Sequence, residues 1–131
     1  MNLFQYYQKK IFICLKSLEK RKLIKIPTEF KNFTIELPPK NQKADLSCNV
    51  AMILAKNNNN SPLNLAAILK NHLLSNIDEF KTIDVAGPGF LNISLHISFW
   101  KKYLKEIIKM NNKFGSYKNF KKKFIIKFYR I

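Results

Sequence analysis

The stretch IDVAGPGFLNISL, residues 83–95, decides the fold class of this chain. Two short runs with strand-like composition flank a tight turn at residues 86–89, where a proline lies between two glycines, and this pattern is typical of a β-hairpin. Side chains of a strand alternate between two faces. The apolar face of the second run carries Leu91, Ile93 and Leu95, and the mixed face carries Phe90, Asn92 and Ser94. We expect the apolar face to be buried and the mixed face, with its aromatic ring and amide, to be exposed.

Two helices are predicted immediately before this hairpin. Ser61 followed by Pro62 marks a helix start, because serine caps free N–H groups and proline fits the first helical turn. Apolar residues at helical spacing continue this helix to residue 75. The four asparagines at 57–60 form a turn, and residues 45–56 form the preceding helix, with Asp45 or Ser47 as its cap. The two helices would make a helical hairpin with a short connection.

The remaining segments complete a mixed fold. Residues 3–20 and 99–110 have the apolar spacing of amphipathic helices. Residues 33–37 alternate as a strand, which two prolines end. Three further segments are a polar loop at 40–43, a basic loop at 112–123 and a strand-like segment at 124–129. These elements predict the α+β class, with a small antiparallel sheet packed with several helices in a single domain.

The charge balance favours a polyanionic partner. The chain has 131 residues, with 24 Lys and Arg against 8 Asp and Glu, and its net charge is +16. Nucleic acid is the first candidate and an anionic membrane the second. Part of the charge can reflect coding bias, because an A/T-rich genome raises the lysine, asparagine, isoleucine and phenylalanine content together. Arg21 and Arg130 are the only arginines, which weakens any expectation of bidentate phosphate or base recognition.

Nothing in the sequence indicates a catalytic or metal site. Cys14 and Cys48 lie far apart without a CxxC motif, and His72 and His96 are isolated. We therefore expect no metal site and two buried thiols in a reducing compartment. Ser47 has no evident activating histidine, and glycine-rich phosphate-binding motifs are absent, so we expect no catalytic residue and no bound cofactor. The longest apolar run near the start is too short for a signal peptide or a membrane span, and the chain should be cytoplasmic.

The mixed face of the hairpin has the chemistry of a nucleotide contact. An aromatic ring can stack on an unpaired base, and an amide two residues further along can donate to and accept from the base edge. From spacing alone a plain hairpin is favoured instead, in which Phe90 covers the sheet and Asn92 is solvated. A group of lysines near the end of the chain can either neutralise phosphates or form a solvated loop. This group is Lys118, Lys121, Lys122 and Lys123.

Four segments, taken in order, resemble the N-terminal domain of arginine–tRNA ligases. They are FTIELPP at 33–39, ADLSCNVAMILAK at 44–56, SPLNLA at 61–66 and AGPGFLNI at 86–93, and their order and spacing agree over residues 1 to about 127. The resemblance implies a domain that binds the outer corner of arginine-isoacceptor tRNAs and reads a D-loop base. Phe90 and Asn92 match the family's base-contacting aromatic and amide, and Gly87 would allow a close backbone approach. This implication outweighs the plain hairpin. Ala44 replaces a glycine that is usual in the family, and alanine is less favourable than glycine wherever the backbone adopts a left-handed turn.

The resemblance also predicts how the chain is organised. Residues 1–123 would form the D-loop-recognising domain, and residues 124–131 would begin the strand that in the family leads into the catalytic domain. Because the chain ends at Ile131, we expect it to be truncated before that domain. It should then be inactive alone, since ATP and arginine are bound by the full-length ligase, and it should be a monomer without a membrane partner.

Two alternatives remain open. The chain can be one part of a ligase whose remainder is encoded separately. It can also be a non-enzymatic basic protein that binds RNA or a membrane surface without specificity.

Overall fold

The computed structural model describes residues 3–28, 30 and 33–111. The chain divides into two compact units, Met1–Ser94 and Leu95–Ile131. The predicted basic loop at 112–123, its four lysines and the predicted strand at 124–129 lie outside the described residues.

A four-stranded antiparallel sheet forms the centre of the first unit. Its strands are β1 (Ile35–Glu36), β2 (Leu46–Cys48), β3 (Phe80–Ala86) and β4 (Phe90–Leu95), and their order across the sheet is β1-β2-β4-β3. The register pairs Glu36 with Ser47 and Ser47 with Asn92, so these three polar residues form one row across the sheet. The hairpin at residues 83–95 and the α+β class are confirmed.

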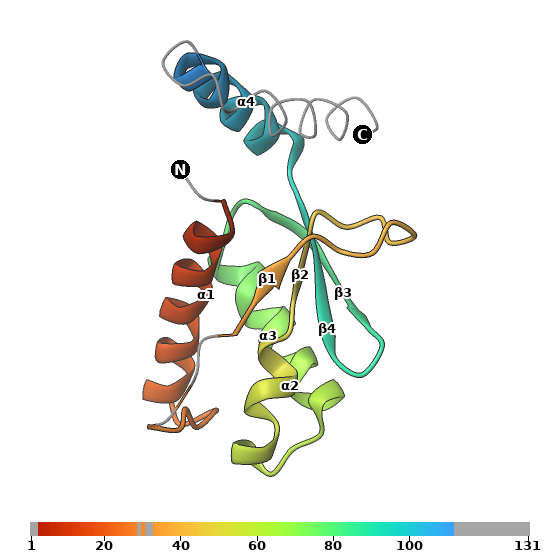
Figure 1. The fold of residues 1–131 in the computed structure, drawn as a ribbon. Coiled ribbons are helices and arrows are strands. Elements are labelled where there is room, and N and C mark those ends of the chain that lie inside the picture. Colours follow the sequence, from red (N-terminus) through yellow and green to blue (C-terminus); the bar gives the residue numbers. More distant parts are fainter. Residues whose placement is uncertain (1–2, 29, 31–32, 112–131) are drawn as a thin grey trace. The chain divides into compact units, whose positions relative to one another are not determined.

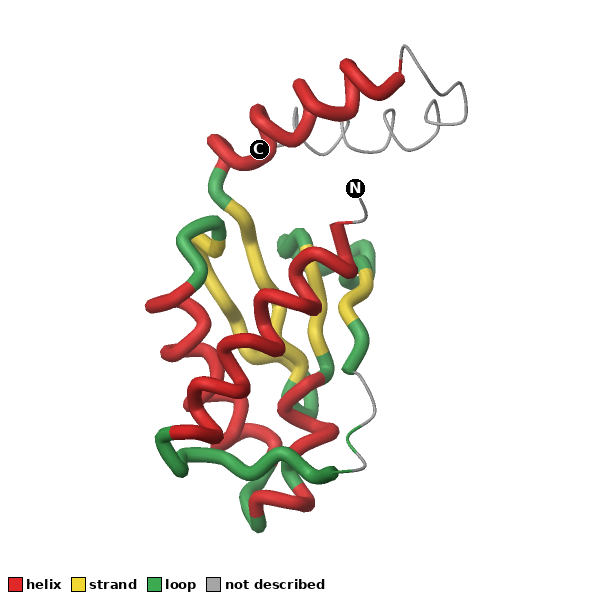
Figure 2. Tube along the Cα trace, turned by 90° about the vertical axis from the view of Figure 1, so that its left-hand side faces the viewer, coloured by secondary structure: helices red, strands yellow, loops and turns green. Residues whose placement is uncertain are grey.

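Helices cover one face of this sheet. They are α1 (Leu3–Lys20), the short α2 (Val50–Leu54), the 3-10 turn η1 (Lys56–Asn58) and α3 (Pro62–Asn76). Figures 1 and 2 show α1 and α3 on the same side of the strands. The buried residues of α1 recur every three or four positions, as predicted: Leu3, Tyr7, Ile11, Cys14, Leu15 and Leu18. The predicted start of α3 is confirmed, because the Ser61 hydroxyl accepts a hydrogen bond from the Asn64 N–H at 3.1 Å.

The segment before α2 differs from its prediction. Residues 46–48 form strand β2 rather than the first turn of a helix, so the predicted helix at 45–56 starts only at Val50. Asp45 and Ser47 do not cap it: the Asp45 N–H extends the ladder by donating to the Ile93 carbonyl at 2.8 Å. Asn49 stands at the cap position, but its side chain accepts from the Thr34 N–H at 2.8 Å instead. Pairing with two distant strands therefore outweighs the local helix signal.

The second unit contains helix α4 (Ile97–Asn111). This helix starts two residues before the predicted range of 99–110. Trp100, Tyr103 and Ile107 are buried and recur at helical spacing. The ring of Phe99 stacks on that of Tyr103, with centroids 5.7 Å apart.

Two further expectations concern cysteines and membranes. Cys14 and Cys48 are both free and buried, as predicted. None of the described helices combines the length and the apolar character that a membrane span requires.

Candidate nucleic-acid interface

The turn between β3 and β4 is fixed in place by its second glycine. Gly89 has a φ of +136°, which L residues rarely adopt, and its N–H donates to the Ala86 carbonyl at 3.2 Å. A Cβ at this position would lie 2.9 Å from the Cβ of Pro62 and 3.3 Å from the Cγ of Met52. The turn therefore packs directly on the start of α3 and on α2, and only glycine permits this approach.

The side chain of Phe90 follows this turn and is accessible. Phe90 is 39% exposed, as predicted, although aromatic side chains of this size are usually buried in small domains. Gly87 has a φ of +56°, and a Cβ there would lie 3.9 Å from Cδ2 of the Phe90 ring. The ring thus lies beside a residue without a side chain.

Asn92 does not lie as predicted. It belongs to the same strand face as Phe90, but only 5% of it is exposed, so the expectation of an exposed amide is wrong. Its Nδ2 donates to Oε1 of Gln42 at 3.3 Å. Its Oδ1 is buried and accepts no hydrogen bond from any residue that the structure describes. Leu91, Ile93 and Leu95 are buried, as the predicted alternation along β4 requires. The Asn92 amide is bonded to a loop residue 50 positions earlier in the sequence.

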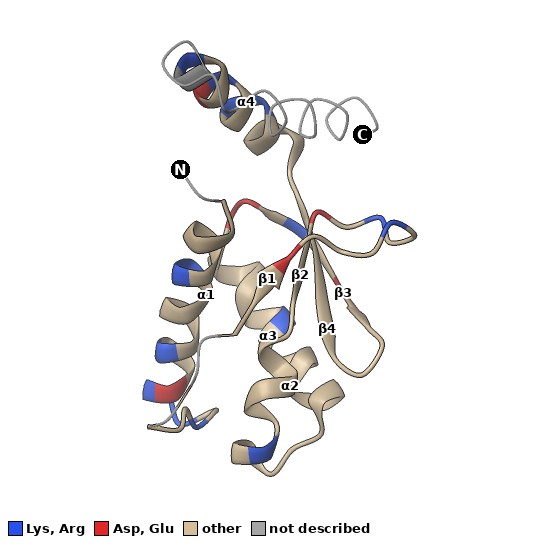
Figure 3. Cartoon of the chain, in the orientation of Figure 1, with Lys and Arg blue, Asp and Glu red and all other residues tan. Residues whose placement is uncertain are grey.

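The covering segment is the loop between β1 and β2, residues 37–45, which we call the β1–β2 loop. Figure 1 shows it on the side of the sheet away from α1. The Ser94 hydroxyl donates to the Lys43 carbonyl at 3.5 Å, which adds to the Gln42–Asn92 bond and ties the loop to β4. Lys40 and Lys43 of this loop have exposed side chains. Figure 3 colours the positions of lysine and arginine along the ribbon. Lys40 and Lys43 were not predicted as site residues, because the attachment of their loop to β4 depends on contacts between residues far apart in the sequence.

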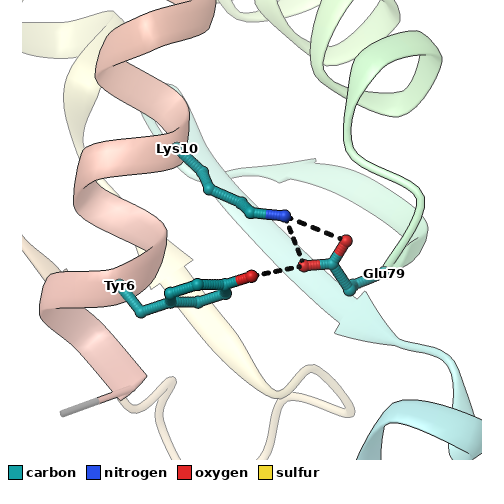
Figure 4. Close-up of polar contacts among 3 residues, drawn as sticks. All are labelled: Tyr6, Lys10 and Glu79. Atoms are coloured by element: carbon teal, nitrogen blue, oxygen red, sulfur yellow. Dashed lines mark hydrogen bonds and ion pairs between the residues drawn. The ribbon is translucent and has the colours of Figure 1, made fainter. Parts of the chain in front are cut away.

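A cluster of three residues attaches α1 to the segment before β3 (Figure 4). Lys10 Nζ lies 2.9 Å from Oε2 and 3.3 Å from Oε1 of Glu79, and the Tyr6 hydroxyl donates to Oε2 at 3.4 Å. Burial raises the pKa of the Glu79 carboxyl, but the hydrogen bond and charge of Lys10 outweigh it, and the pKa lies below its ordinary value of 4.5. Burial lowers the pKa of Lys10, but its contacts with Glu79 and Tyr6 outweigh that effect, and the pKa lies above 10.5. This partly buried cluster acts in stability rather than in chemistry.

Two observations concern metal ligands and nucleophiles among the described residues. They contain no group of three His, Cys, Asp or Glu side chains that could bind a metal ion. Burial raises the pKa of the Cys48 thiol to about 12, so this side chain is not a nucleophile in the folded protein. Among the polar and aromatic groups described above, the Phe90 ring, the Gln42 amide and the side chains of Lys40 and Lys43 are exposed, whereas Asn92 is buried.

Comparisons with known proteins identify the family of this chain. A family model described as the arginyl tRNA synthetase N terminal domain matches residues 9–95. The arginine–tRNA ligase of Pelagibacter ubique is 34% identical over 98% of this chain and 22% of that protein. That of Wolbachia pipientis is 35% identical over 88% of this chain and 20% of that protein.

A solved structure agrees at the level of the fold. The arginyl-tRNA synthetase of Thermus thermophilus has a TM-score of 0.57 and 21% identity over 81% of this chain and 16% of that chain. The chain thus spans about a fifth of the length of the curated relatives it matches. Because the family model covers well over half of its residues, the chain belongs to the family of arginyl-tRNA synthetase N-terminal domains.

Proposed function

We propose that this chain is a tRNA-binding module that contacts the D-loop of arginine tRNAs with the ring of Phe90. The observation that carries the proposal is an exposed aromatic side chain, placed by a turn that only glycine allows, in a member of this family. A ring that water already reaches can stack on an unpaired base with little rearrangement, and such stacking contributes about 1–3 kcal/mol per base.

The charge supplies the second part of the proposed mechanism. A chain with a net charge of +16 attracts RNA at long range, and lysines at the surface then neutralise phosphates. Lys40 and Lys43 lie within two residues of Gln42, whose side chain is bonded to Asn92 of β4. Both lysines are exposed. Lys118 and Lys121–Lys123 stay part of the proposal as further phosphate contacts, although they lie outside the described residues.

Gly87 and Asn92 have different roles in this proposal. Gly87 carries no side chain beside the Phe90 ring, so a ribose or phosphate can approach the backbone of the turn. Asn92 is buried and its Nδ2 donates to Gln42 Oε1, so its proposed hydrogen bond to a base edge requires that the Gln42 side chain move aside. We assign tRNA recognition to residues 1–123 of a monomeric cytoplasmic protein, and we leave ATP and arginine to the catalytic part of full-length ligases.

The experiment that tests the proposal is binding of the whole chain to arginine tRNA across a salt series, beside a transcript with an altered D-loop. A preference for the natural D-loop that persists at moderate salt supports base recognition, because base stacking depends weakly on ionic strength. Equal binding of both transcripts that collapses with salt overturns it. That outcome would leave a basic protein that binds RNA through charge alone.

A further inference from the structure

The end of helix α1 and the short helix η1 carry a group of exposed cations. Residues 20–28 and 49–64 contain no Asp or Glu, and the acidic residue that follows the first segment, Glu29, lies outside the described residues. Figure 3 shows basic positions at the end of α1, in the segment after it and on η1. We call the following exposed residues the basic cluster: Lys20, Arg21, Lys22, Lys25 and Lys56.

None of these five side chains forms an ion pair with a described residue, although other lysines of α1 do. Lys10 pairs with Glu79, and Lys16 Nζ lies 3.4 Å from Oε1 of Glu19. The second carboxylate oxygen of Glu19 accepts from the Ile26 N–H at 3.2 Å. Both oxygens of the acidic residue nearest to the basic cluster in sequence are therefore engaged by other groups, and five charges of one sign remain together.

Asn58 holds the two parts of the basic cluster next to each other. Its side chain bonds to both backbone groups of Lys25, at 2.6 Å to the N–H and 3.0 Å to the carbonyl. Its Nδ2 also donates to the Leu54 carbonyl at 2.8 Å, at the end of α2. Lys56 is only two residues from Asn58, so cations from two distant segments share one surface. Like charges held together repel one another, which destabilises the folded chain unless a polyanion binds.

Lys22 has a backbone conformation for which glycine is the usual residue. Its N–H donates to the Glu19 carbonyl at 2.9 Å. The Leu23 N–H donates to the Leu18 carbonyl at 3.0 Å, and these two bonds make the Schellman motif that commonly ends helices. Lys22 has the left-handed φ of 60° that the motif requires, which is unfavourable for a residue with a Cβ. A lysine here lowers stability while it adds a charge to the basic cluster, as expected of a residue with a binding role.

The surroundings of the basic cluster favour RNA over a membrane surface. A helix that lies on a membrane inserts its apolar face, but the apolar face of α1 is buried in the core. Ile13 and Leu23 are exposed singly, which is ordinary at protein surfaces. The basic cluster is instead bordered by the exposed amides of Asn57 and Asn59. Amides bind phosphate and ribose oxygens, and lysines neutralise successive phosphates of a backbone.

The basic cluster lies near the β3–β4 turn but shares no residue with it. The turn packs on Met52 of α2 through Gly89, and η1 with Lys56 follows α2 almost directly. Figure 1 shows α2 at the lower end of the sheet, where α1 also ends. RNA that is held at the turn therefore has the basic cluster within reach of its backbone.

We propose that the basic cluster is a phosphate-binding surface for the backbone of an RNA, separate from the Phe90 ring. The inference rests on the proposed function only in taking RNA as the partner, and it does not need a base at Phe90. Because recognition is by charge, it is independent of base sequence and sensitive to salt.

The test compares two triple variants of the whole chain that lose the same net charge. The cluster variant combines Lys22→Gln, Lys25→Gln and Lys56→Gln. The control variant replaces exposed lysines outside the basic cluster and combines Lys9→Gln, Lys81→Gln and Lys101→Gln. The probes are an arginine tRNA transcript and the same transcript with its D-loop bases replaced, each measured across a salt series.

The cluster variant should bind both transcripts about ten- to a hundredfold more weakly than the parent at low salt. The slope of log affinity against log salt concentration should become shallower by about 2–3, because three phosphate contacts are lost. The control variant should lose less than about threefold, with little change in slope. Equal losses by the two variants, or an unchanged slope in the cluster variant, overturn the inference.

Lys22→Gly separates binding from folding. Glycine suits the left-handed conformation, so this variant should unfold at a higher urea concentration than the parent. It should still bind both transcripts about three- to tenfold more weakly, because one phosphate contact is lost. Lys22→Arg keeps the charge and should bind like the parent. Unchanged RNA affinity in both Lys22→Gly and the cluster variant contradicts the proposed surface.

Three further outcomes show which proposal fails. Vesicles of phosphatidylcholine and phosphatidylserine are the membrane probe: if the cluster variant loses binding to them but keeps its tRNA affinity, the surface is for membranes and the inference is wrong. If the parent shows no D-loop preference but the cluster variant still loses affinity and slope, the proposed function fails and this inference stands. If D-loop preference depends on Phe90 while the cluster variant binds like the control variant, only this inference fails.

Discussion

Gly89 lies against Pro62 so closely that a single added carbon would be 2.9 Å from the proline ring. This contact joins the turn of the β3–β4 hairpin to the first residue of α3. It explains why the two most recognisable segments of the sequence, the glycine-proline turn and the Ser61-Pro62 helix start, act as one structural unit. The position of Phe90 depends on that unit.

The first prediction concerns this glycine. Gly89→Ala should lower the free energy of unfolding by about 2–3 kcal/mol, because it combines a clash with Pro62 and an unfavourable φ. Gly87→Ala is the matched control, since its added Cβ meets only ordinary contacts, and it should cost about 1 kcal/mol. Urea unfolding measures both. Equal, small losses would contradict the close approach at Gly89.

A second prediction concerns Asn58, which clamps two segments together. Its Oδ1 accepts from the Lys25 N–H at 2.6 Å, and its Nδ2 donates to the carbonyls of Lys25 and Leu54 at 3.0 and 2.8 Å. Asn58→Ala should destabilise the protein by about 2 kcal/mol, because three partners are affected. Asn57→Ala, one residue away and exposed, should change stability by less than about 0.5 kcal/mol. Similar values for the two variants would argue against the clamp.

The Lys10–Glu79 pair predicts a pH dependence. The pKa of Glu79 is lower in the folded chain than its ordinary value of 4.5, so the ionised pair contributes stability above that pH. This contribution is lost as pH falls through the folded pKa, and at the alkaline end it is lost as pH rises above 10.5 through the raised pKa of Lys10. Because both side chains are partly exposed, the pair is worth at most about 1 kcal/mol.

Glu79→Gln isolates this effect. The variant should be less stable than the parent at pH 7, and the difference should shrink as the pH is lowered below about 4.5 in urea titrations. In this variant Lys10 loses its charged partner, whereas the glutamine at position 79 keeps the shape of the glutamate side chain. A difference that stays constant from pH 7 to pH 3 would show that the charge of Glu79 is not what stabilises α1 on the rest of the unit.

A fourth prediction uses the cysteines as probes of folding. Burial raises the pKa of Cys48 to about 12 and also raises that of Cys14, and both thiols are buried. In native buffer at pH 8, Cys48 should therefore react with an alkylating reagent only as fast as the chain opens, while both cysteines should react promptly in urea. Immediate labelling of Cys48 without denaturant would contradict the core position of β2.

Local sequence patterns correctly predicted the helices whose apolar spacing and capping residues lie within the helix itself or directly beside it. The spacing of apolar residues predicted α1 with its bounds, and the serine–proline pair predicted the start of α3. Strand β2 was missed because Asp45 and Ser47 are residue types that cap helices, and Val50, Ile53 and Leu54 follow them at helical spacing. What decides between helix and strand is pairing with β1 on one side and β4 on the other, which no local pattern contains.

The candidate site divides in the same way. Alternation along β4 correctly placed Phe90 and Asn92 on one face, and the glycine turn correctly left Phe90 exposed. The burial of Asn92 could not be predicted, because the β1–β2 loop that covers it is about 50 residues away in the chain. This separation in sequence also explains why Gln42, Lys40 and Lys43 were not predicted as site residues.

The central claim is that Phe90 stacks on a D-loop base, and binding of arginine tRNA by Phe90→Ala tests it most directly. Ile68→Ala is the matched control, because Ile68 on α3 is also 39% exposed. The account predicts that Phe90→Ala loses about five- to a hundredfold in affinity, with its fold and salt dependence unchanged, while Ile68→Ala binds like the parent. Equal affinity of Phe90→Ala and the parent for the natural tRNA would contradict it.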